Sequence, residues 1–357
     1  MKVWTSLAVV AVGAVATVNA VTWNLKDTIN GNSYMDKFDY FTDKDPTNGL
    51  VVYQNQQQAQ QLNLTYAHGE DFVIRVDTTK TRAEGRPSVR LQSKANYGDS
   101  VIILQMSHIP TGCAVWPAFW TVTSDVSKWP TGGEIDIMEN VNDQYAYNLA
   151  SLHVKDQCSV ANGDQSGTTV FPNCNYQANE QSGCRIAMNG TKSATWGSKV
   201  NSKGGGVVAM HRDFSQNGKG IRMWYWDRTQ NMPSDISKPG KTVNPDSWGT
   251  PAANFGKLSC TGGADGASQF DDHKIVFDIT LCGDWADGAY NQTQCPSKYQ
   301  ACSNQVGNAG SSFDDAYWQV QNLYVYQTDS ASSAASLALP MLAYLAAAAL
   351  VGLTLFA

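Results

Sequence analysis

The sequence predicts an all-β protein, a β-sandwich of many short strands. Runs in which apolar and polar residues alternate recur along the chain, as expected for half-buried strands. Clusters of Gly, Asn, Asp and Pro separate these runs, and such residues favour turns. No long segment repeats its apolar residues with the 3.6-residue period of an amphipathic helix. These observations together favour a sandwich of antiparallel sheets.

Five runs define the predicted strands most clearly. They cover residues 72–77, 101–106, 221–226, 274–279 and 318–326. Residues 101–106 are apolar on both faces, as expected for a central strand that is covered on both sides. Residues 155–206 are rich in Gly, Asn, Ser and Cys, and this composition predicts long loops.

The most informative segment reads Gly-Gly-Glu-Ile-Asp-Ile-Met-Glu at residues 132–139. In a strand, Glu134 and Asp136 share one face, whereas strict alternation turns Glu139 to the other. One extra residue, a β-bulge, would return Glu139 to the acidic side, and bulges are common beside active sites. Crowding three carboxylates raises at least one pKa. Glycoside hydrolysis uses such a set, because it needs a carboxylate and a protonated carboxyl group together.

Two other interpretations of this segment remain open, a solvated acidic edge strand and a calcium site. Calcium usually takes its oxygen ligands from flexible loops, whereas this segment has the alternation of a strand with one buried face. The acidic pattern therefore favours catalysis.

The order of the flanking motifs resembles glycoside hydrolase family 16, in the branch of fungal laminarinase-like endo-1,3(4)-β-glucanases. The family pattern Glu-x-Asp-x-x-Glu is complete in Glu134, Asp136 and Glu139, with the laminarinase spacing of two residues before the last Glu. The lichenase and plant transglycosylase form has one residue there. The resemblance extends from about residue 27 to about residue 326. The other matching segments are 85–90 (GRPSVR), 112–121 (GCAVWPAFWT), 129–133 (WPTGG), 151–154 (SLHV) and 282–286 (CGDWA).

The resemblance implies a jelly roll of two curved antiparallel sheets with a substrate cleft across the concave face. It implies that Glu134 is the nucleophile, Glu139 the general acid/base, and Asp136 a supporting residue that keeps the two glutamate pKa values apart. A purely structural role for Asp136 is the alternative. The reaction would retain the anomeric configuration, which requires the two carboxyl groups to lie only about 5–5.5 Å apart.

The resemblance also implies five sugar-binding residues. Trp116, Trp120 and Trp285 resemble aromatic residues of the family's cleft, His153 a hydrogen-bonding residue, and Arg90 an arginine that contacts sugar hydroxyls. Core packing is the alternative for Trp120, which lies in an apolar run. A satisfied core histidine is the alternative for His153, and a buried ion pair for Arg90. Trp285 occurs in a polar segment, 283–288, that predicts a loop.

The two ends of the sequence carry targeting signals. Residues 1–20 combine Lys2, an apolar run and a small-residue cleavage site, which together predict a secretory signal peptide. Residues 329–357 combine small polar residues with an uncharged apolar tail, which predicts a GPI-attachment signal with Ser330 as the attachment residue. A membrane helix is the alternative, although such helices normally have flanking Lys or Arg. The catalytic domain is then 21–328, anchored by lipid to the extracellular face of the plasma membrane or to the cell wall.

Eight cysteines in a secreted chain predict up to four disulfides, whose pairing the sequence leaves open. None has the spacing of a zinc site, so we expect no metal ligands among them. Sequons at Asn63, Asn189 and Asn291 predict a glycoprotein.

Composition limits the partners and cofactors. The formal net charge of −6 argues against a nucleic-acid partner and suits a neutral substrate. Eleven Trp and fifteen Tyr suit a polysaccharide groove or an aromatic core equally well. We expect a monomer that needs no cofactor. The resemblance leaves a structural calcium ion open, since some relatives hold one on the convex side.

Three functions compete. The resemblance implies first an endo-acting hydrolase of β-1,3 or mixed β-1,3/1,4-glucan. A cell-wall glucan transglycosylase would use the same carboxylates, with a sugar hydroxyl in place of water. A glucan-binding lectin on the same fold is the third alternative, but such relatives typically lack the catalytic glutamates that this chain has.

Overall fold

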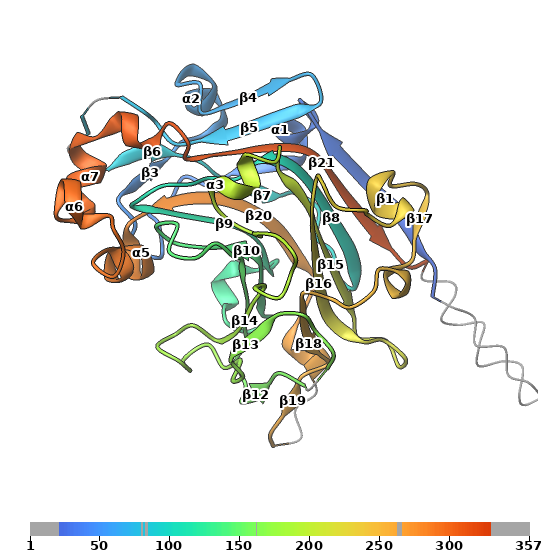
Figure 1. Ribbon diagram of the computed structural model, residues 1–357. Coiled ribbons are helices and arrows are strands. Elements are labelled where there is room, and N and C mark those ends of the chain that lie inside the picture. The colour runs from blue at the N-terminus through green and yellow to red at the C-terminus, as the bar shows by residue number, and fades with distance from the viewer. Residues whose placement is uncertain (1–20, 80, 83–84, 162, 263–265, 330–357) are drawn as a thin grey trace, which may run out of the picture.

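Two antiparallel sheets stacked face to face make up most of the molecule (Figure 1). The computed structural model describes residues 21–79, 81–82, 85–161, 163–262 and 266–329. Sheet A runs, in spatial order, through β17 (Thr242–Val243), β1 (Trp23–Asn30), β21 (Tyr317–Gln327), β8 (Ser100–His108), β15 (Gly206–Asp213), β16 (Gly220–Asp227) and β18 (Ala253–Gly256), and β5 (Asp71–Arg75) with β4 (Thr65–His68) joins it at β21.

Sheet B contains the acidic segment in one of its central strands. Its order is β13 (Thr168–Phe171), β14 (Cys184–Ala187), β11 (Leu149–His153), β10 (Glu134–Glu139), β9 (Val115–Thr123), β20 (His273–Leu281), β7 (Arg90–Ser93) and β2 (Phe38–Tyr40). Two small pairs complete the described strands, β12 (Cys158–Ser159) with β19 (Ser259–Cys260) and β3 (Val51–Tyr53) with β6 (Arg86–Ser88).

The described helices are short and lie at the margins of the sheets. The α-helices are α1 (Ser33–Lys37), α2 (Gln56–Gln61), α3 (Ser198–Asn201), α4 (Ser234–Ser237), α5 (Gly283–Tyr290), α6 (Pro296–Tyr299) and α7 (Cys302–Asn308). The 3₁₀ helices are η1 (Val126–Lys128), η2 (Pro245–Ser247), η3 (Gly266–Gln269) and η4 (Gly310–Phe313). No helix of the described part is long and apolar enough to cross a membrane.

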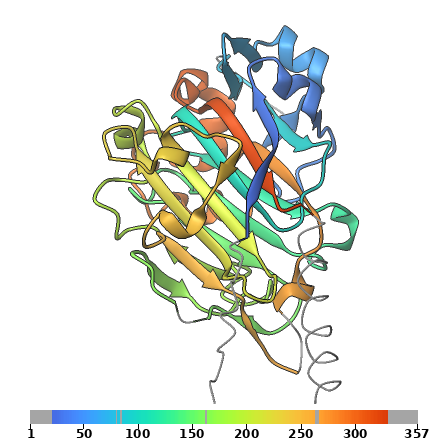
Figure 2. The same cartoon turned by 90° about the vertical axis from the view of Figure 1, so that its right-hand side faces the viewer.

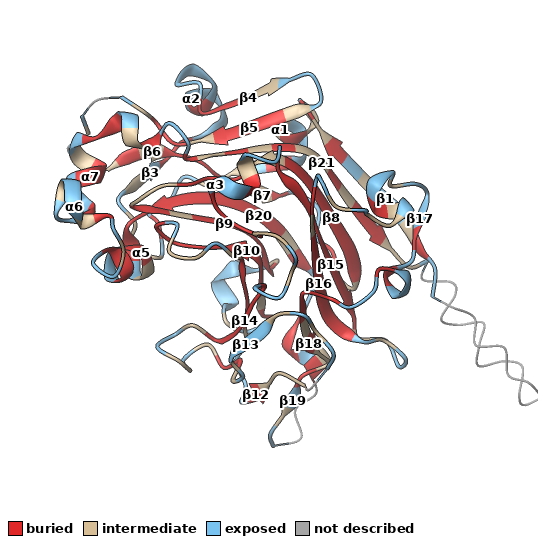
Figure 3. Ribbon diagram, in the orientation of Figure 1, coloured by how far each residue is buried: buried red, intermediate tan, exposed pale blue. Residues whose placement is uncertain are grey.

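The main core fills the space between the sheets. The strands are mostly buried, while much of the rim formed by helices and loops is exposed (Figure 3). The alternating residues that the sequence predicts to point inward do so, including Ile102 and Leu104 of β8, Ile135 of β10, and Ile275 and Phe277 of β20. The prediction of an all-β sandwich is therefore confirmed.

The opposite side of sheet A is covered by the chain itself. Figure 2 faces this side, where β1 and β21 lie side by side and the segment around α4 and β17 crosses the sheet. Ile236, Val243 and Trp248 of that segment pack against Val101 and Ile103 of β8. This cover explains why residues 101–106 are apolar on both faces.

One prediction about loops is confirmed in part and another is wrong. Residues 155–206 consist mostly of loops, but they also contain β12, β13, β14 and α3, and β14 pairs with β11 and extends sheet B beyond the acidic strand. Trp285 lies on the helix α5 rather than in a loop. The sequence of α5 is rich in Gly and Asp and has little helical character, and the disulfides at its two sides hold it in place.

All eight cysteines are paired, as predicted, in four disulfides. The pairs are Cys113–Cys295, Cys158–Cys260, Cys174–Cys184 and Cys282–Cys302. The side chains of Asn63, Asn189 and Asn291 are exposed, which leaves their predicted glycosylation open. The predicted signal peptide and the predicted attachment residue Ser330 with its apolar tail lie outside the described residues.

Candidate active site

Strand β10 has the bulge that the sequence predicts. Asp136 pairs with Trp120 of β9, but the next pair is Met138 with Phe119, so Ile137 is the extra residue. Ile137 and Met138 both point into the core between the sheets. The bulge therefore returns Glu139 to the side of Glu134 and Asp136. We call this side of sheet B, defined by Glu134, Asp136, Glu139 and Asp278, the acidic face.

A buried asparagine satisfies the backbone that the bulge leaves unpaired. Strand β11 pairs with β10 only along residues 134–136. Beyond that point Asn148 replaces the missing partner: its Oδ1 accepts a hydrogen bond from the Glu139 N–H at 2.8 Å, and its Nδ2 donates to the Ile137 carbonyl at 2.7 Å. Asn148 is fully buried. The position of Glu139 therefore depends on this side chain.

Two glycines and a histidine fix the start of β10. Gly132 and Gly133 both have positive φ, 88° and 78°, which other residues rarely adopt. A Cβ on Gly133 would lie 2.5 Å from the Phe270 ring. His273 Nε2 donates to the Gly132 carbonyl at 2.7 Å, and its Nδ1 accepts from the Thr121 hydroxyl at 2.8 Å. Burial lowers the pKa of His273 to about 3, which keeps the ring neutral for this pattern.

The acidic face concentrates carboxyl groups in a poorly solvated place. Burial raises the pKa of Glu134 to about 8, and the neighbouring charge of Asp136 adds to the rise. Burial likewise raises the pKa values of Asp136 and Glu139 to about 7, and for Glu139 the charge of Asp136 again contributes. Like charges close together make it unfavourable for all three carboxyl groups to ionise. At least one of the three therefore keeps its proton near neutral pH.

His153 faces the first two acids from the neighbouring strand. It lies opposite Glu134 in the β10–β11 register. Its Nε2 is 3.3 Å from Asp136 Oδ2 and 3.8 Å from Glu134 Oε1. The side chain is 12% exposed and belongs to the acidic face, so the alternative of a satisfied core histidine is wrong.

Trp116 and Trp285 lie on the Glu139 side of the site. Trp116 Nε1 donates a hydrogen bond to Glu139 Oε1 at 2.8 Å. The two indole rings meet edge to face, with 5.7 Å between their centroids. The Arg185 guanidinium of β14 stacks over Trp285 at 4.3 Å from the ring centroid, and its Nε donates to the Ser151 hydroxyl at 3.2 Å. Arg185 thus reaches from the far side of β10 to α5.

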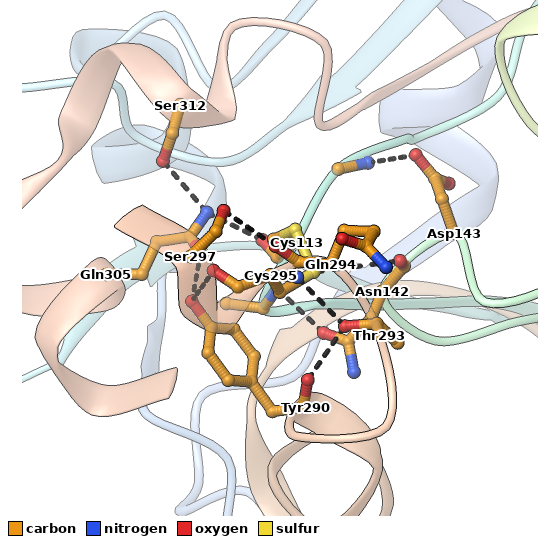
Figure 4. The surroundings of a disulfide bond; sticks show 12 residues. Cys113, Asn142, Asp143, Tyr290, Thr293, Gln294, Cys295, Ser297, Gln305 and Ser312 are labelled. Carbon is orange, nitrogen blue, oxygen red and sulfur yellow. Dashed lines mark hydrogen bonds between the residues drawn. A yellow bond between two sulfur atoms is a disulfide. The ribbon is translucent and has the colours of Figure 1, made fainter. Parts of the chain in front are cut away.

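A disulfide and a hydrogen bond connect the region around α5 to the segments next to β9 and β10. Figure 4 shows the Cys113–Cys295 disulfide, which joins the segment before β9 to the segment after α5. Asn142, just after β10, donates to the Ala286 carbonyl of α5 at 2.8 Å. These links hold Trp285 in a fixed relation to Trp116 and to Glu139.

Arg90, Trp120 and Asp278 form the other flank of the acids. The Arg90 guanidinium lies 4.9 Å from the centroid of the Trp120 ring and 4.8 Å from that of Phe41. Trp120 is only 9% exposed and packs with Ala118, so it belongs to the acidic face rather than to the core between the sheets. Its Nε1 donates to Asp278 Oδ2 at 3.1 Å.

Asp278 is another buried carboxyl group, which sequence reasoning did not single out as functional. Burial raises its pKa to about 7, although Arg90 opposes the rise. The alternation of residues 274–279 places Asp278 on the opposite face of the strand from Phe277, and this was the only signal in the sequence that pointed to it. Arg185 and Asn148 were also missed, and neither lies in a pattern that could have indicated it.

Side chains able to bind a metal come together at two places in the described part of the chain. One comprises Cys282, Asp287 and Cys302, but its cysteines form a disulfide. The other comprises Glu134, Asp136 and His153, whose ligand atoms all lie within 4.8 Å of one another. Neither provides the set of six to eight oxygen atoms that calcium prefers.

A separate hollow of about 720 Å³ opens at the strand ends, beside Arg212 and Phe270. It shares no residue with the acidic face, and Arg212 is already ion-paired with Asp99 at 3.3 Å. The size of this hollow alone therefore does not identify it as the active site.

Comparison with known proteins gives one consistent match. Residues 38–326 match the family model described as XgeA-like, catalytic GH16 domain. The chain is 35% identical over 327 residues to an endo-1,3(4)-beta-glucanase of Arthroderma benhamiae, which covers 89% of this chain and 68% of that protein.

Two solved structures resemble the fold closely. Laminarinase 16A from Phanerochaete chrysosporium, with beta-glucans in its donor and acceptor sites, is 36% identical with a TM-score of 0.78, and the match covers 86% of this chain and 100% of the other. An elongating GH family 16 beta-1,3-glucosyltransferase is 34% identical with a TM-score of 0.76, covering 85% of this chain and 100% of that one.

Proposed function

The chain belongs to glycoside hydrolase family 16, and from this premise we propose that it is an endo-1,3(4)-β-glucanase that cuts internal linkages with retention of configuration. One observation carries the proposal: the bulge in β10 brings Glu134, Asp136 and Glu139 to one face, where burial raises all three pKa values. A retaining glycosidase needs this combination of a carboxylate and a retained proton.

The proposed reaction has two steps. In the first, Glu139 donates its proton to the glycosidic oxygen as the bond from that oxygen to the anomeric carbon breaks, and the Glu134 carboxylate forms an ester to the same carbon. In the second, Glu139 accepts a proton from water, whose oxygen attacks the anomeric carbon and releases Glu134. The assignment of the two roles comes from the family resemblance, since the pKa values of both glutamates are raised.

We assign Asp136 and His153 to the support of Glu134. His153 Nε2 lies 3.8 Å from Glu134 and 3.3 Å from Asp136, and positive charge on its ring would lower the pKa of Glu134. Asp136 adds negative charge next to both glutamates, so when it is ionised it favours the retention of a proton on one of them. The hydrogen bond from Trp116 to Glu139 orients the proposed acid.

We propose that a glucan chain lies across the strands of the acidic face. Trp116 and Trp285, both half-buried, would stack against sugar rings beside Glu139. On the other flank the aromatic faces of Trp120 and Phe41 hold the Arg90 guanidinium, and its hydrogen-bond donors suit sugar hydroxyls.

Transglycosylation is the second candidate, and the similarity to the elongating glucosyltransferase supports it. The same two glutamates would serve, with a sugar hydroxyl in place of water in the second step. A lectin is disfavoured because both glutamates are present and share one face.

Product analysis on defined substrates tests the proposal. Purified protein is incubated with laminarin, with lichenan, and with a labelled laminari-oligosaccharide acceptor. New reducing ends without longer labelled products indicate hydrolysis, whereas longer labelled products indicate transfer. Binding without either product would leave only the lectin.

The proposal extends to the setting in which the enzyme acts. The predicted signal peptide, sequons and attachment signal support a secreted glycoprotein held by a lipid anchor at the cell surface or wall. We propose that the enzyme acts as a monomer on β-glucan and that its reaction needs no cofactor. Calcium-dependent changes in melting temperature would reveal a structural calcium ion.

A further inference from the structure

Three side chains of the acidic face present ligand atoms at the spacing of a zinc site. His153 Nε2 is 3.3 Å from Asp136 Oδ2 and 3.8 Å from Glu134 Oε1. Zinc bonds of about 2.0–2.2 Å at tetrahedral angles separate their ligand atoms by about 3.3–3.6 Å. The three ligand atoms all lie within 4.8 Å of one another, and the two separations from His153 are already within a few tenths of an ångström of this range.

In the part of the chain that the structure describes, the Asp136 oxygen nearest to His153 accepts no hydrogen bond. Asp136 is only 3% exposed, and no group in the described part of the chain donates a hydrogen bond to its Oδ2. A buried carboxylate oxygen without a donor is costly, and a bound cation satisfies it. This observation is separate from the clustering of acids, because it concerns the hydrogen bonding of one buried oxygen atom.

From these contacts we infer that the acidic face binds one Zn²⁺ ion through Glu134, Asp136 and His153, and that this ion excludes the substrate. Zinc accepts both imidazole nitrogen and carboxylate oxygen as ligands, and an open site with three protein ligands leaves its fourth position to water. Calcium is disfavoured because it takes six to eight oxygens, and the histidine nitrogen offers none.

The ion would inhibit rather than assist the proposed reaction. Glu134 would be a zinc ligand, and a ligating carboxylate oxygen cannot attack the anomeric carbon. The ion would lie on the acidic face, where the sugar is proposed to lie. Inhibition therefore rests on the proposed function, whereas zinc binding does not.

Calorimetric titration of the purified protein with ZnCl₂ tests the site without reference to activity. We expect one Zn²⁺ per molecule, and for His153→Gln a dissociation constant raised at least about tenfold. The matched control is His68→Gln, because His68 is exposed on β4, away from the acidic face, and its loss should leave binding unchanged. CaCl₂ should not compete with zinc for binding to either variant.

The outcomes separate cleanly. Absence of zinc binding by the unaltered protein, or equal binding by His153→Gln, would overturn the proposal, and so would loss of binding in His68→Gln. If His153→Gln does not fold, the unaltered protein with Co²⁺ decides: an intense visible spectrum indicates the tetrahedral site, and a weak octahedral one overturns it. Where glucanase activity is found, zinc should raise KM and leave kcat unchanged. Lack of activity would refute the proposed function but leave the metal measurement intact.

Discussion

The two outer faces of the sandwich contain similar residues, but one face is covered by the chain and the other forms the candidate active site. The outer face of sheet A, defined by Trp23, His211, Arg222 and Trp224, is covered by the segment around α4 and η2. Its charges are balanced, since Arg222 binds Asp246 at 2.9 Å and the buried His211 has its pKa lowered to about 4 and stays neutral. Aromatic residues on this face are core residues.

The acidic face of sheet B has the same mixture of tryptophan and charge but an excess of one sign. Three buried carboxyl groups, on Asp136, Glu139 and Asp278, and the half-buried carboxyl group of Glu134 face two arginines and one histidine. The carboxyl pKa values rise in consequence. A functional face is therefore distinguished from a structural one by unbalanced buried charge rather than by its aromatic content.

The largest expected effect is the loss of either glutamate. Glu134→Gln and Glu139→Gln remove the proposed nucleophile and acid/base, and each should lower kcat by about 10³-fold or more. Asp246→Asn on the covered face is the matched control and should leave kcat unchanged. Near-normal turnover by Glu134→Gln would remove the nucleophile assignment.

Removal of the amide that supports the bulge should have the second largest effect. Asn148→Leu leaves the Glu139 N–H and the Ile137 carbonyl without their partners. We expect kcat to fall about 10- to 100-fold and the free energy of unfolding to fall by about 1–3 kcal/mol. Steady-state kinetics and denaturant unfolding measure the two quantities.

The control for Asn148 is Asn244→Ala, which removes a hydrogen bond to the Asp246 N–H at the start of η2 on the cover of sheet A. It should cost about 0.5–1 kcal/mol of stability and no turnover. Equal effects of the two variants on kcat would show that Asn148 has no special relation to Glu139.

The acidic face also shows which features the sequence could predict and which it could not. Alternation and turn residues sufficed for the two sheets, and the spacing of Glu134, Asp136 and Glu139 sufficed for the bulge. Asn148 and Arg185 act through contacts made across strands, and no local pattern records such contacts. Helix α5 was missed because disulfides and packing, rather than its own helix propensity, stabilise it.

A smaller effect is expected from the cation that spans the acidic face. Arg185→Gln removes both the stacking on Trp285 and a positive charge that lowers the pKa values of Asp136 and Glu139. We expect KM to rise about tenfold, a cost of about 1.4 kcal/mol, and the activity profile to shift to higher pH. Arg185→Lys should restore the pH profile but not KM, because lysine keeps the charge without the planar stacking.

Arg222→Lys on the covered face provides the comparison for Arg185. It should move neither KM nor the pH profile, since Arg222 stacks on Trp224 beneath the covering segment. A pH profile that stays fixed in Arg185→Gln would show that this cation does not act on the carboxyl groups.

The smallest effect concerns stability against pH, and there the two faces have opposite signs. Raised carboxyl pKa values mean that the folded state binds more protons than the unfolded state between about pH 4 and pH 8, so stability falls as pH rises. His211 on the covered face and His273 between the sheets have lowered pKa values, so their contribution rises with pH up to about 6.5. Above that pH the carboxyl contribution stands alone.

We therefore expect the free energy of unfolding to fall by about 1–2 kcal/mol between pH 6.5 and 8. Asp278→Asn should make this fall shallower, because its amide does not ionise. Thermal unfolding at the two pH values measures this fall in stability. The covered face provides a second test, because His211→Gln should change the pH dependence of stability only below pH 6.5. If stability rose between pH 6.5 and 8, the carboxyl groups of the acidic face would be ionised in the folded protein. The retained proton on which the proposed acid/base depends would then be missing.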